Sequence, residues 1–262
     1  MDSARIAELL RPYLGPSAAP PSGDSERSET SPERSRKDSA FPSASDLQYI
    51  STYIDILLRW NARINLTAIR DPEEIVARHF GESLFAACHL YPGNIRAGTA
   101  APGCPAGQSS VLPAPVFAKD PQPSTNDRID LLDLGAGAGF PGIPIKLWAT
   151  HLRVTLIESN QKKATFLREV IRALTLTDIN VFGSRAEIFP GRASVVTLRA
   201  VERFEQALPL ASSLVAPQGR LALLIGSAQL PRAQELAPFF QWQEPISIPG
   251  STSRVLLLGM KG

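Results

Sequence analysis

The spacing of hydrophobic and polar positions changes along the chain at about residue 129. From there, short apolar runs alternate with amphipathic stretches, as in RIDLLDLG, RVTLIES, INVFGS, SVVTLRA and GRLALLIG. Apolar runs of this length predict buried strands, and the intervening stretches, such as QKKATFLREVIRALTL, predict helices. Strands that alternate with helices form a mostly parallel sheet covered by helices on both faces. We therefore predict an α/β fold whose ligands bind at the carboxyl ends of the strands.

The segment before residue 92 follows a helical spacing instead. After Asp46, apolar residues recur on one helical face at Leu47, Ile50, Ile54 and Leu57, and Ser45 with Gln48 predicts the capping box of this helix. A second helix is predicted to begin at Asp71, followed by Pro72 in its first turn. The polar joint between the two helices reads RWNARINLTAIRD.

Two segments hold too few large apolar residues to form a core. Between Gly15 and Asp46 the chain has no Ile, Leu, Val or Met, and residues 92–128 are rich in Pro, Gly, Ala and Ser. We predict a helical module over residues 1–91 with a disordered insertion over 15–45, a low-complexity insertion over 92–128, and an α/β domain over 129–262. A turn at Pro249-Gly250 predicts that this last domain ends in an antiparallel hairpin.

Composition narrows the class of protein only slightly. The 262 residues carry a net charge of +2, which is too small to indicate a nucleic-acid partner by itself. Cys88 and Cys104 have no paired spacing, and His79 and His89 have no acidic or thiol partners at metal-ligand spacing, so we expect neither a disulfide scaffold nor a metal site. The start MDSARIAELL does not resemble a signal peptide, and no run of about 18 apolar residues is present. These features predict a soluble cytoplasmic protein, which we expect to be a monomer.

The glycine-rich stretch LLDLGAGAGFPG is compatible with two cofactors. Gly137, Gly139 and Gly142 satisfy the GxGxxG pattern that holds the pyrophosphate of a nicotinamide dinucleotide. Gly135, Gly137 and Gly139 also satisfy DxGxGxG counted from Asp133, which is typical of S-adenosylmethionine methyltransferases. An acid as close as Asp133 disfavours a pyrophosphate and suits a sulfonium cofactor with an amino group. Glu158, at the end of the next strand, suits the ribose of either cofactor.

Several motifs occur together in this chain: RWNARINLTAIRDPEEIVARHFGESL at 59–84, DLGAGAGFPGIP, LIES, SRAE at 184–187 and LRA at 198–200. The set resembles the 16S ribosomal RNA guanine-N7 methyltransferase G family, also called glucose-inhibited division protein B, over about residues 46–90 and from 129 to the C-terminus. The resemblance implies a class I methyltransferase fold with S-adenosylmethionine as the methyl donor. It also implies that the acceptor is a guanine in the decoding region of 16S ribosomal RNA in the small ribosomal subunit.

The same resemblance assigns roles to individual residues. It implies cofactor contacts for residues of the glycine loop and of the strand ends: Asp133, Gly135, Gly137, Phe140, Glu158, Ser159, Ala186, Glu187 and Arg199. It implies that Arg78, Asn65, His79 and Ser83 of the helical module lie at the site. We predict that Asn65, His79 and Ser83 are catalytic together with Arg199. Methylation at N7 of guanine needs no general base, because N7 carries a lone pair and no proton; Arg199 is the candidate donor to the base.

Two departures from the family pattern suggest an alternative function. The family usually has Asp at the position of Glu82 and Lys at the position of Ile225. The alternative is a catalytically impaired ribosome-binding assembly factor that keeps the fold, and a nicotinamide-dependent oxidoreductase is a third hypothesis. We predict that a row of basic side chains binds the phosphates of the RNA: Arg59, Arg63, Arg70, Arg78, Lys162, Lys163, Arg168 and Arg172. We assign Trp60 to the core.

Overall fold

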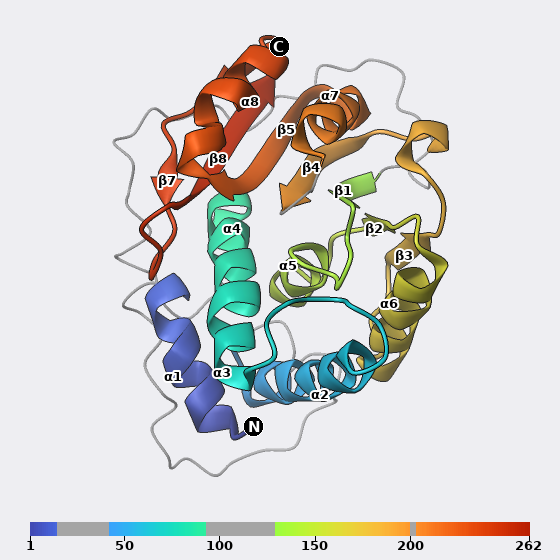
Figure 1. Ribbon diagram of the computed structural model, residues 1–262, viewed down its shortest axis with the longest axis vertical. Coiled ribbons are helices and arrows are strands. Elements are labelled where there is room, and N and C mark those ends of the chain that lie inside the picture. The colour runs from blue at the N-terminus through green and yellow to red at the C-terminus, as the bar shows by residue number, and fades with distance from the viewer. Residues whose placement is uncertain (15–41, 93–128, 200–202) are drawn as a thin grey trace, which may run out of the picture.

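The structure is a computed structural model of the protein, and it describes residues 1–14, 42–92, 129–199 and 203–262. Its centre is an eight-stranded sheet in the order β3-β2-β1-β4-β5-β8-β6, with β7 paired to β8 (Figure 1). The parallel strands are β1 (Ile129–Leu134), β2 (Val154–Ile157), β3 (Ile179–Phe182), β4 (Ala193–Arg199) and β5 (Val215–Gly226). Antiparallel strands complete the sheet: β6 (Phe240–Trp242), β7 (Ile246–Ser247) and β8 (Arg254–Lys261). The predicted mostly parallel α/β fold with a C-terminal antiparallel hairpin is confirmed.

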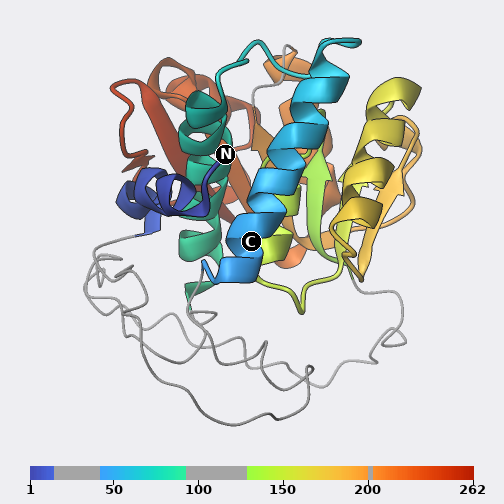
Figure 2. The ribbon, with the colours of Figure 1, turned by 90° about the horizontal axis from the view of Figure 1, so that it is seen from below.

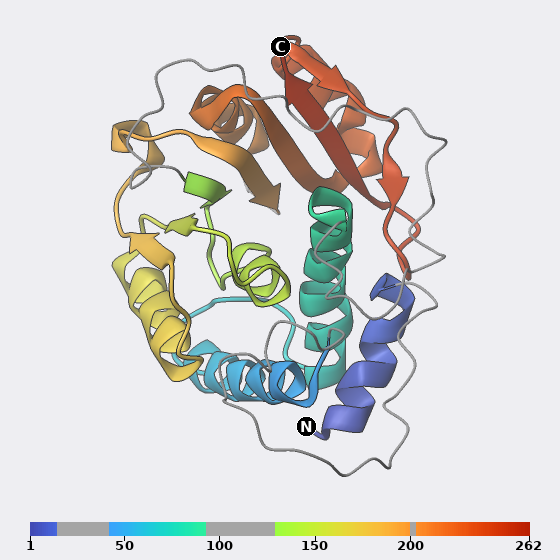
Figure 3. The ribbon, with the colours of Figure 1, turned by 180° about the vertical axis from the view of Figure 1, so that it is seen from behind.

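Helices cover both faces of the sheet, as Figures 1 and 3 show from opposite sides. One face carries α5 (Gly142–Trp148) and α6 (Gln161–Ala173), and the other carries α7 (Phe204–Leu214) and α8 (Leu230–Leu236). Successive residues of β1 point to opposite sides: Leu131 belongs to the first core cluster and Leu132 to the second. Because both faces of the sheet are covered, apolar residues occur in neighbouring positions of these strands and not only at every second position.

The N-terminal helices lie on the face that carries α5. They are α1 (Ser3–Leu14), α2 (Ala44–Asn61) and a continuous helical run of α3 (Pro72–Glu74), a π-helical turn (Ile75–Gly81) and α4 (Glu82–Leu90). In Figure 2, α2 lies between α4 and α6, with α5 behind it. Buried side chains of these helices join the same core cluster as those of β1 and β2, so the helices are fixed against the sheet.

Three details differ from the sequence-based expectations. The capping box of α2 is formed by Ser43 and Asp46, not by Ser45 and Gln48, because the Asp46 carboxylate accepts both the N–H and the hydroxyl of Ser43. The helix α1 was not anticipated, and the last helix runs over Leu230–Leu236 rather than around 233–239.

The predicted insertions lie mostly outside the described residues, apart from 42–45, where α2 begins, and Pro92. None of the helices in the described part of the chain is long and apolar enough to cross a membrane.

Candidate active site

The glycine loop between β1 and α5 adopts a backbone that only glycine tolerates well. Gly135, Gly137 and Gly139 have φ angles of +69°, +53° and +87°. Gly142 needs to be glycine for another reason: a Cβ there would lie 2.5 Å from the Leu156 side chain and 2.8 Å from an oxygen of Asp133. The left-handed positions therefore follow the DxGxGxG spacing, and Gly142 allows α5 to approach the sheet closely.

Asp133 holds this loop in place. It is buried, and its two carboxylate oxygens accept hydrogen bonds from the Gly142 N–H at 3.0 Å and from the Thr197 hydroxyl at 2.8 Å. Burial raises the pKa of Asp133 to about 6, although both hydrogen bonds act in the opposite direction. The predicted contact between Asp133 and the cofactor remains a prediction, and its observed role is to connect the loop to β4.

The Glu158 carboxylate lies beside the loop at the end of β2. It accepts hydrogen bonds from the Gly137 N–H at 2.9 Å and from the Asn160 N–H at 2.7 Å. A carboxylate oxygen can accept more than one hydrogen bond, so Glu158 keeps lone pairs for the two hydroxyls of a ribose. Gly135 is exposed, and a Cβ on Gly137 would meet nothing closer than the Gly135 oxygen at 3.7 Å, so there is space next to the loop. These residues fit a nucleoside-bearing cofactor.

The other predicted cofactor residues lie on neighbouring strand ends. Leu134, Ile157 and Phe182 are aligned across β1, β2 and β3, so the residues that follow them share the carboxyl edge of the sheet. Ser159 is exposed after β2, while the short 3₁₀ turn after β3 contains a buried Ala186 and an exposed Glu187. This placement brings the predicted cofactor residues to one edge.

Asn61 organises the joint that contains the motif WNARINLT. Its side-chain oxygen accepts the N–H groups of Leu66 and Thr67 at 2.9 and 3.1 Å, and its amide donates to the Thr67 carbonyl at 2.9 Å. The Thr67 hydroxyl, held in this turn, lies 2.8 Å from Nε2 of His79. The motif therefore leads directly to one of the predicted catalytic residues.

His79 is a neutral link between the joint and Arg199. Its Nδ1 lies 3.1 Å from Nη1 of Arg199, and because a guanidinium only donates, Nδ1 accepts and the ring proton resides on Nε2, facing Thr67. Burial lowers the pKa of His79 to about 3, and the charges of Arg199, Arg78 and Arg254 act in the same direction. Among the residues that the structure describes, no cluster of His, Cys, Asp or Glu could hold a metal ion. The observed contacts of His79 connect the joint to Arg199, and its catalytic role remains a prediction.

Phe140 joins the glycine loop to the helical module. Its ring stacks with that of Tyr53, with centroids 5.3 Å apart, and with that of His79, with centroids 4.7 Å apart. The Tyr53 hydroxyl also donates to the Ala138 carbonyl within the loop. These contacts fix Phe140 between the loop and the module, and its predicted place along the cofactor path remains a prediction.

Arg199 ends β4 and reaches into the helical module. Its Nη2 donates to the Arg78 carbonyl at 2.7 Å and to Oε2 of Glu82 at 3.0 Å. The second oxygen of Glu82 forms an ion pair with Nη2 of Arg254 at 2.5 Å. Glu82 is buried, so one carboxylate holds two arginines from two different strands.

The other two residues that we predicted to be catalytic are placed differently. Ser83 is fully buried in α4, and its hydroxyl donates to the His79 carbonyl at 2.5 Å. Asn65 lies exposed on the joint between α2 and α3. Their catalytic roles remain predictions, and the geometry gives Ser83 a helix-internal bond.

Sequence reasoning missed five residues that build this site. Asn61 and Thr67 belong to the quoted motif WNARINLT, so their spacing was a usable signal. Tyr53, Thr197 and Arg254 lie far from their partners along the chain, and only the fold brings them together. Trp60, which we assigned to the core, is partly buried and packs against it: its ring lies edge-on to Phe166 of α6, and its N–H donates to Glu169.

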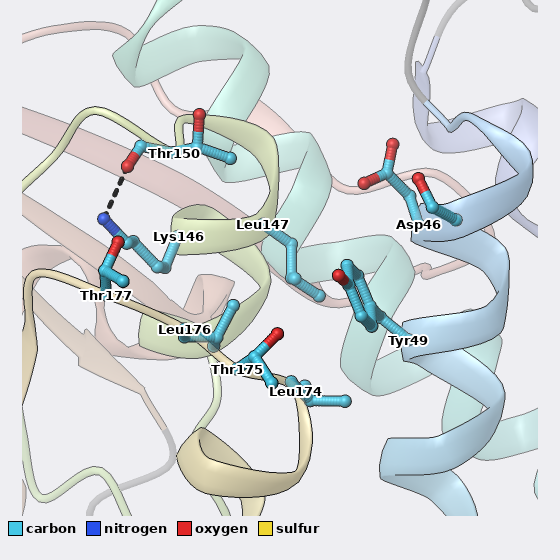
Figure 4. A pocket seen from close by; sticks show the side chains of 10 residues that line it. Asp46, Tyr49, Lys146, Leu147, Thr150, Leu174, Thr175, Leu176 and Thr177 are labelled. Carbon is cyan, nitrogen blue, oxygen red and sulfur yellow. Dashed lines mark hydrogen bonds between the residues drawn. The ribbon is translucent and has the colours of Figure 1, made fainter. Parts of the chain in front are cut away.

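A cavity of about 250 Å³ lies away from these residues (Figure 4). It opens between the start of α2, the end of α5 and the turn after α6, where Thr150 and Thr177 precede β2 and β3. The buried Lys146 ammonium is already bonded there to the carbonyls of Thr150 and Leu152 at 2.5 and 2.6 Å. Because this cavity lies at the edge of the sheet where the parallel strands begin, it is not the candidate active site.

Comparison with known proteins identifies the family. The family model of the rRNA small subunit methyltransferase G matches residues 46–106 and 119–251. The chain is 34% identical over 214 residues to the ribosomal RNA small subunit methyltransferase G of Stenotrophomonas maltophilia (strain K279a), which covers 80% of this chain and 84% of that protein. The protein of the same name from Roseiflexus sp. (strain RS-1) is 36% identical over 227 residues, with 81% and 82% covered.

The chain belongs to the rRNA small subunit methyltransferase G family. Membership confirms the predicted enzyme class, a methyltransferase, and S-adenosylmethionine as the cofactor. Family membership agrees with the positive φ angles of the three glycines at the DxGxGxG spacing. It excludes a nicotinamide-dependent oxidoreductase as the function of this chain.

Proposed function

We propose that this protein transfers the methyl group of S-adenosylmethionine to N7 of a single guanine in the decoding region of 16S ribosomal RNA. The observation that carries the proposal is the hydrogen-bonded path from Thr67 through His79 to Arg199. It joins the motif that is specific to the family to the strand end beside the glycine loop. The proposal includes action as a monomer in the cytoplasm.

The chemistry of the site suits an acceptor atom that needs no deprotonation. When bound, S-adenosylmethionine supplies an electrophilic methyl group on a sulfonium. N7 of guanine attacks with its lone pair, so the protein must align the reacting atoms and exclude water. His79, the one imidazole beside Arg199, has its pKa lowered to about 3 and both of its nitrogens bonded. A site built for positioning rather than for proton abstraction matches this reaction.

Binding of the RNA is assigned to basic side chains near the site. Arg59, Arg63 and Arg70 are exposed at the end of α2 and on the joint, and Lys162 and Arg168 are exposed on α6. The hydrogen bond from Trp60 to Glu169 holds α2 against α6, so the two groups form neighbouring surfaces. Exposed cations that neutralise phosphates predict an affinity that falls as the salt concentration rises.

Transfer of a labelled methyl group from S-adenosylmethionine to ribosomal subunits tests the proposal. We expect small subunits that lack the modification to be labelled and large subunits to remain unlabelled. Arg199→Ala is expected to abolish transfer while the protein still folds. Cofactor binding without transfer to any small-subunit RNA would refute the proposal. That result would support the catalytically impaired assembly factor, the alternative that the family comparisons do not favour.

A further inference from the structure

A small cavity of about 160 Å³ lies at the carboxyl ends of β4 and β5, next to Arg199. Its apolar walls include Leu198, Phe204 and Ile225, and Arg254 lines it from β8, where it pairs with Gly226 of β5. The cavity is on the side of β4 opposite to β1, whereas the glycine loop and Glu158 follow β1 and β2. It is therefore beside the cofactor residues and separate from them.

The two arginines that Glu82 holds differ in the donors they have left. Both terminal nitrogens of Arg199 are engaged, Nη1 with His79 and Nη2 with Glu82 and the Arg78 carbonyl. Arg254 uses Nη2 for Glu82, whereas its Nη1 has no hydrogen-bond or ion-pair partner among the residues described, and its side chain is 28% exposed. Arg254 therefore has a terminal nitrogen left to donate to a ligand in the cavity that it lines.

Apolar walls around a guanidinium fit a flat, neutral ring with an acceptor at its edge better than a phosphate, because the walls would desolvate an anion. We propose that this cavity receives the acceptor guanine and that Arg254 donates a hydrogen bond to its O6. This inference rests on the proposed function and assigns the reading of the base to Arg254 rather than to Arg199. The carboxylate of Glu82 then fixes the distance between the residue that reads the base and the strand end beside the cofactor.

The test compares methyl transfer to small subunits carrying the mapped target guanine with transfer to reconstituted subunits carrying adenine there. Adenine has N7 but presents an amino group in place of O6. We expect Arg254→Met and Arg254→Lys each to lower kcat/KM for the guanine substrate by about 10- to 100-fold and to reduce the preference for guanine, with unchanged affinity for S-adenosylmethionine. Arg232→Met, which removes an exposed arginine paired with Glu205, is the matched control and should behave as the parent protein.

Two further results separate this role from a structural one. Lysine keeps a positive charge beside Glu82 but lacks the guanidinium fork, so full rescue by Arg254→Lys would overturn the inference and leave charge neutralisation as the role of Arg254. Ile225→Phe narrows the cavity and leaves Arg254 in the sequence, and we expect it to impair transfer while the protein still folds and binds S-adenosylmethionine with unchanged affinity; unchanged transfer would overturn the inference. If the parent protein labels neither substrate, the proposed function fails and this inference fails with it.

Discussion

Replacing Glu82 by glutamine should destabilise the protein strongly. The Glu82 side chain is 2% exposed and pairs with Arg199 at 3.0 Å, itself 11% exposed, and with Arg254 at 2.5 Å. Glutamine has the same size, but it is neutral and turns an amide NH₂ toward one of the two donors. Two guanidiniums would then share no negative partner inside the protein. Removing one member of a buried ion pair costs about 3–5 kcal/mol of unfolding free energy.

Urea unfolding and thermal melting measure this loss. A change of about 3–5 kcal/mol corresponds to a fall of about 6–20 °C in Tm for a chain of this size. The control is Glu73→Gln, which removes the partner of Arg5 at the surface, where Glu73 is 48% exposed, and should leave Tm nearly unchanged. Glu82→Asp should fall between the two, because its shorter side chain cannot reach both arginines. A loss of less than about 1 kcal/mol in Glu82→Gln would refute the reasoning.

Close contacts or burial make substitutions at Gly139, Gly81 and His79 measurable. Gly139→Ala should lower the unfolding free energy by about 1–3 kcal/mol and weaken cofactor binding in calorimetry, because φ is +87° and a Cβ would collide with the Tyr53 hydroxyl; unchanged affinity would contradict this. Gly81→Ala should also cost about 1–3 kcal/mol in urea unfolding, because its Cβ would lie 2.6 Å from the Tyr13 ring, whereas stabilisation, the usual result of this change in a helix, would count against that contact. Neutral His79 should make the unfolding free energy of the parent protein larger than that of His79→Gln, and this difference should be complete above pH 6.5. It should be lost as the pH falls toward 3, because the His79 side chain of the unfolded state takes up a proton at a higher pH than that of the folded state. A difference in unfolding free energy that does not vary with pH would disprove this.

The sequence predicted the sheet and the glycine loop because both depend on local signals. Apolar runs marked β1 to β5, and the spacing of glycines after Asp133 marked the positions that take positive φ. The helix α1 was missed because its 12 residues contain Pro12 and because its buried positions, such as Ile6 and Leu10, become informative only against the helices they contact.

The arrangement around Arg199 could not be predicted from local patterns. Arg199, Glu82 and Arg254 lie far apart in the chain and carry charges that, in a sequence, look like those of any exposed residue. Only the fold shows that one buried carboxylate is shared by two arginines. The departure at Glu82, which sequence comparison could only flag as unusual, is therefore part of a complete ion-pair arrangement.

Methylation at N7 of one guanine can be measured directly. The most direct measurement is to let the protein label small subunits that lack the modification and then to cleave the 16S RNA chemically at N7-methylguanine. We expect one cleavage site, in the decoding region, that carries the label and disappears with Arg199→Ala. Label on a base that resists this cleavage, or labelled sites scattered along the RNA, would contradict methylation at N7 of a single guanine.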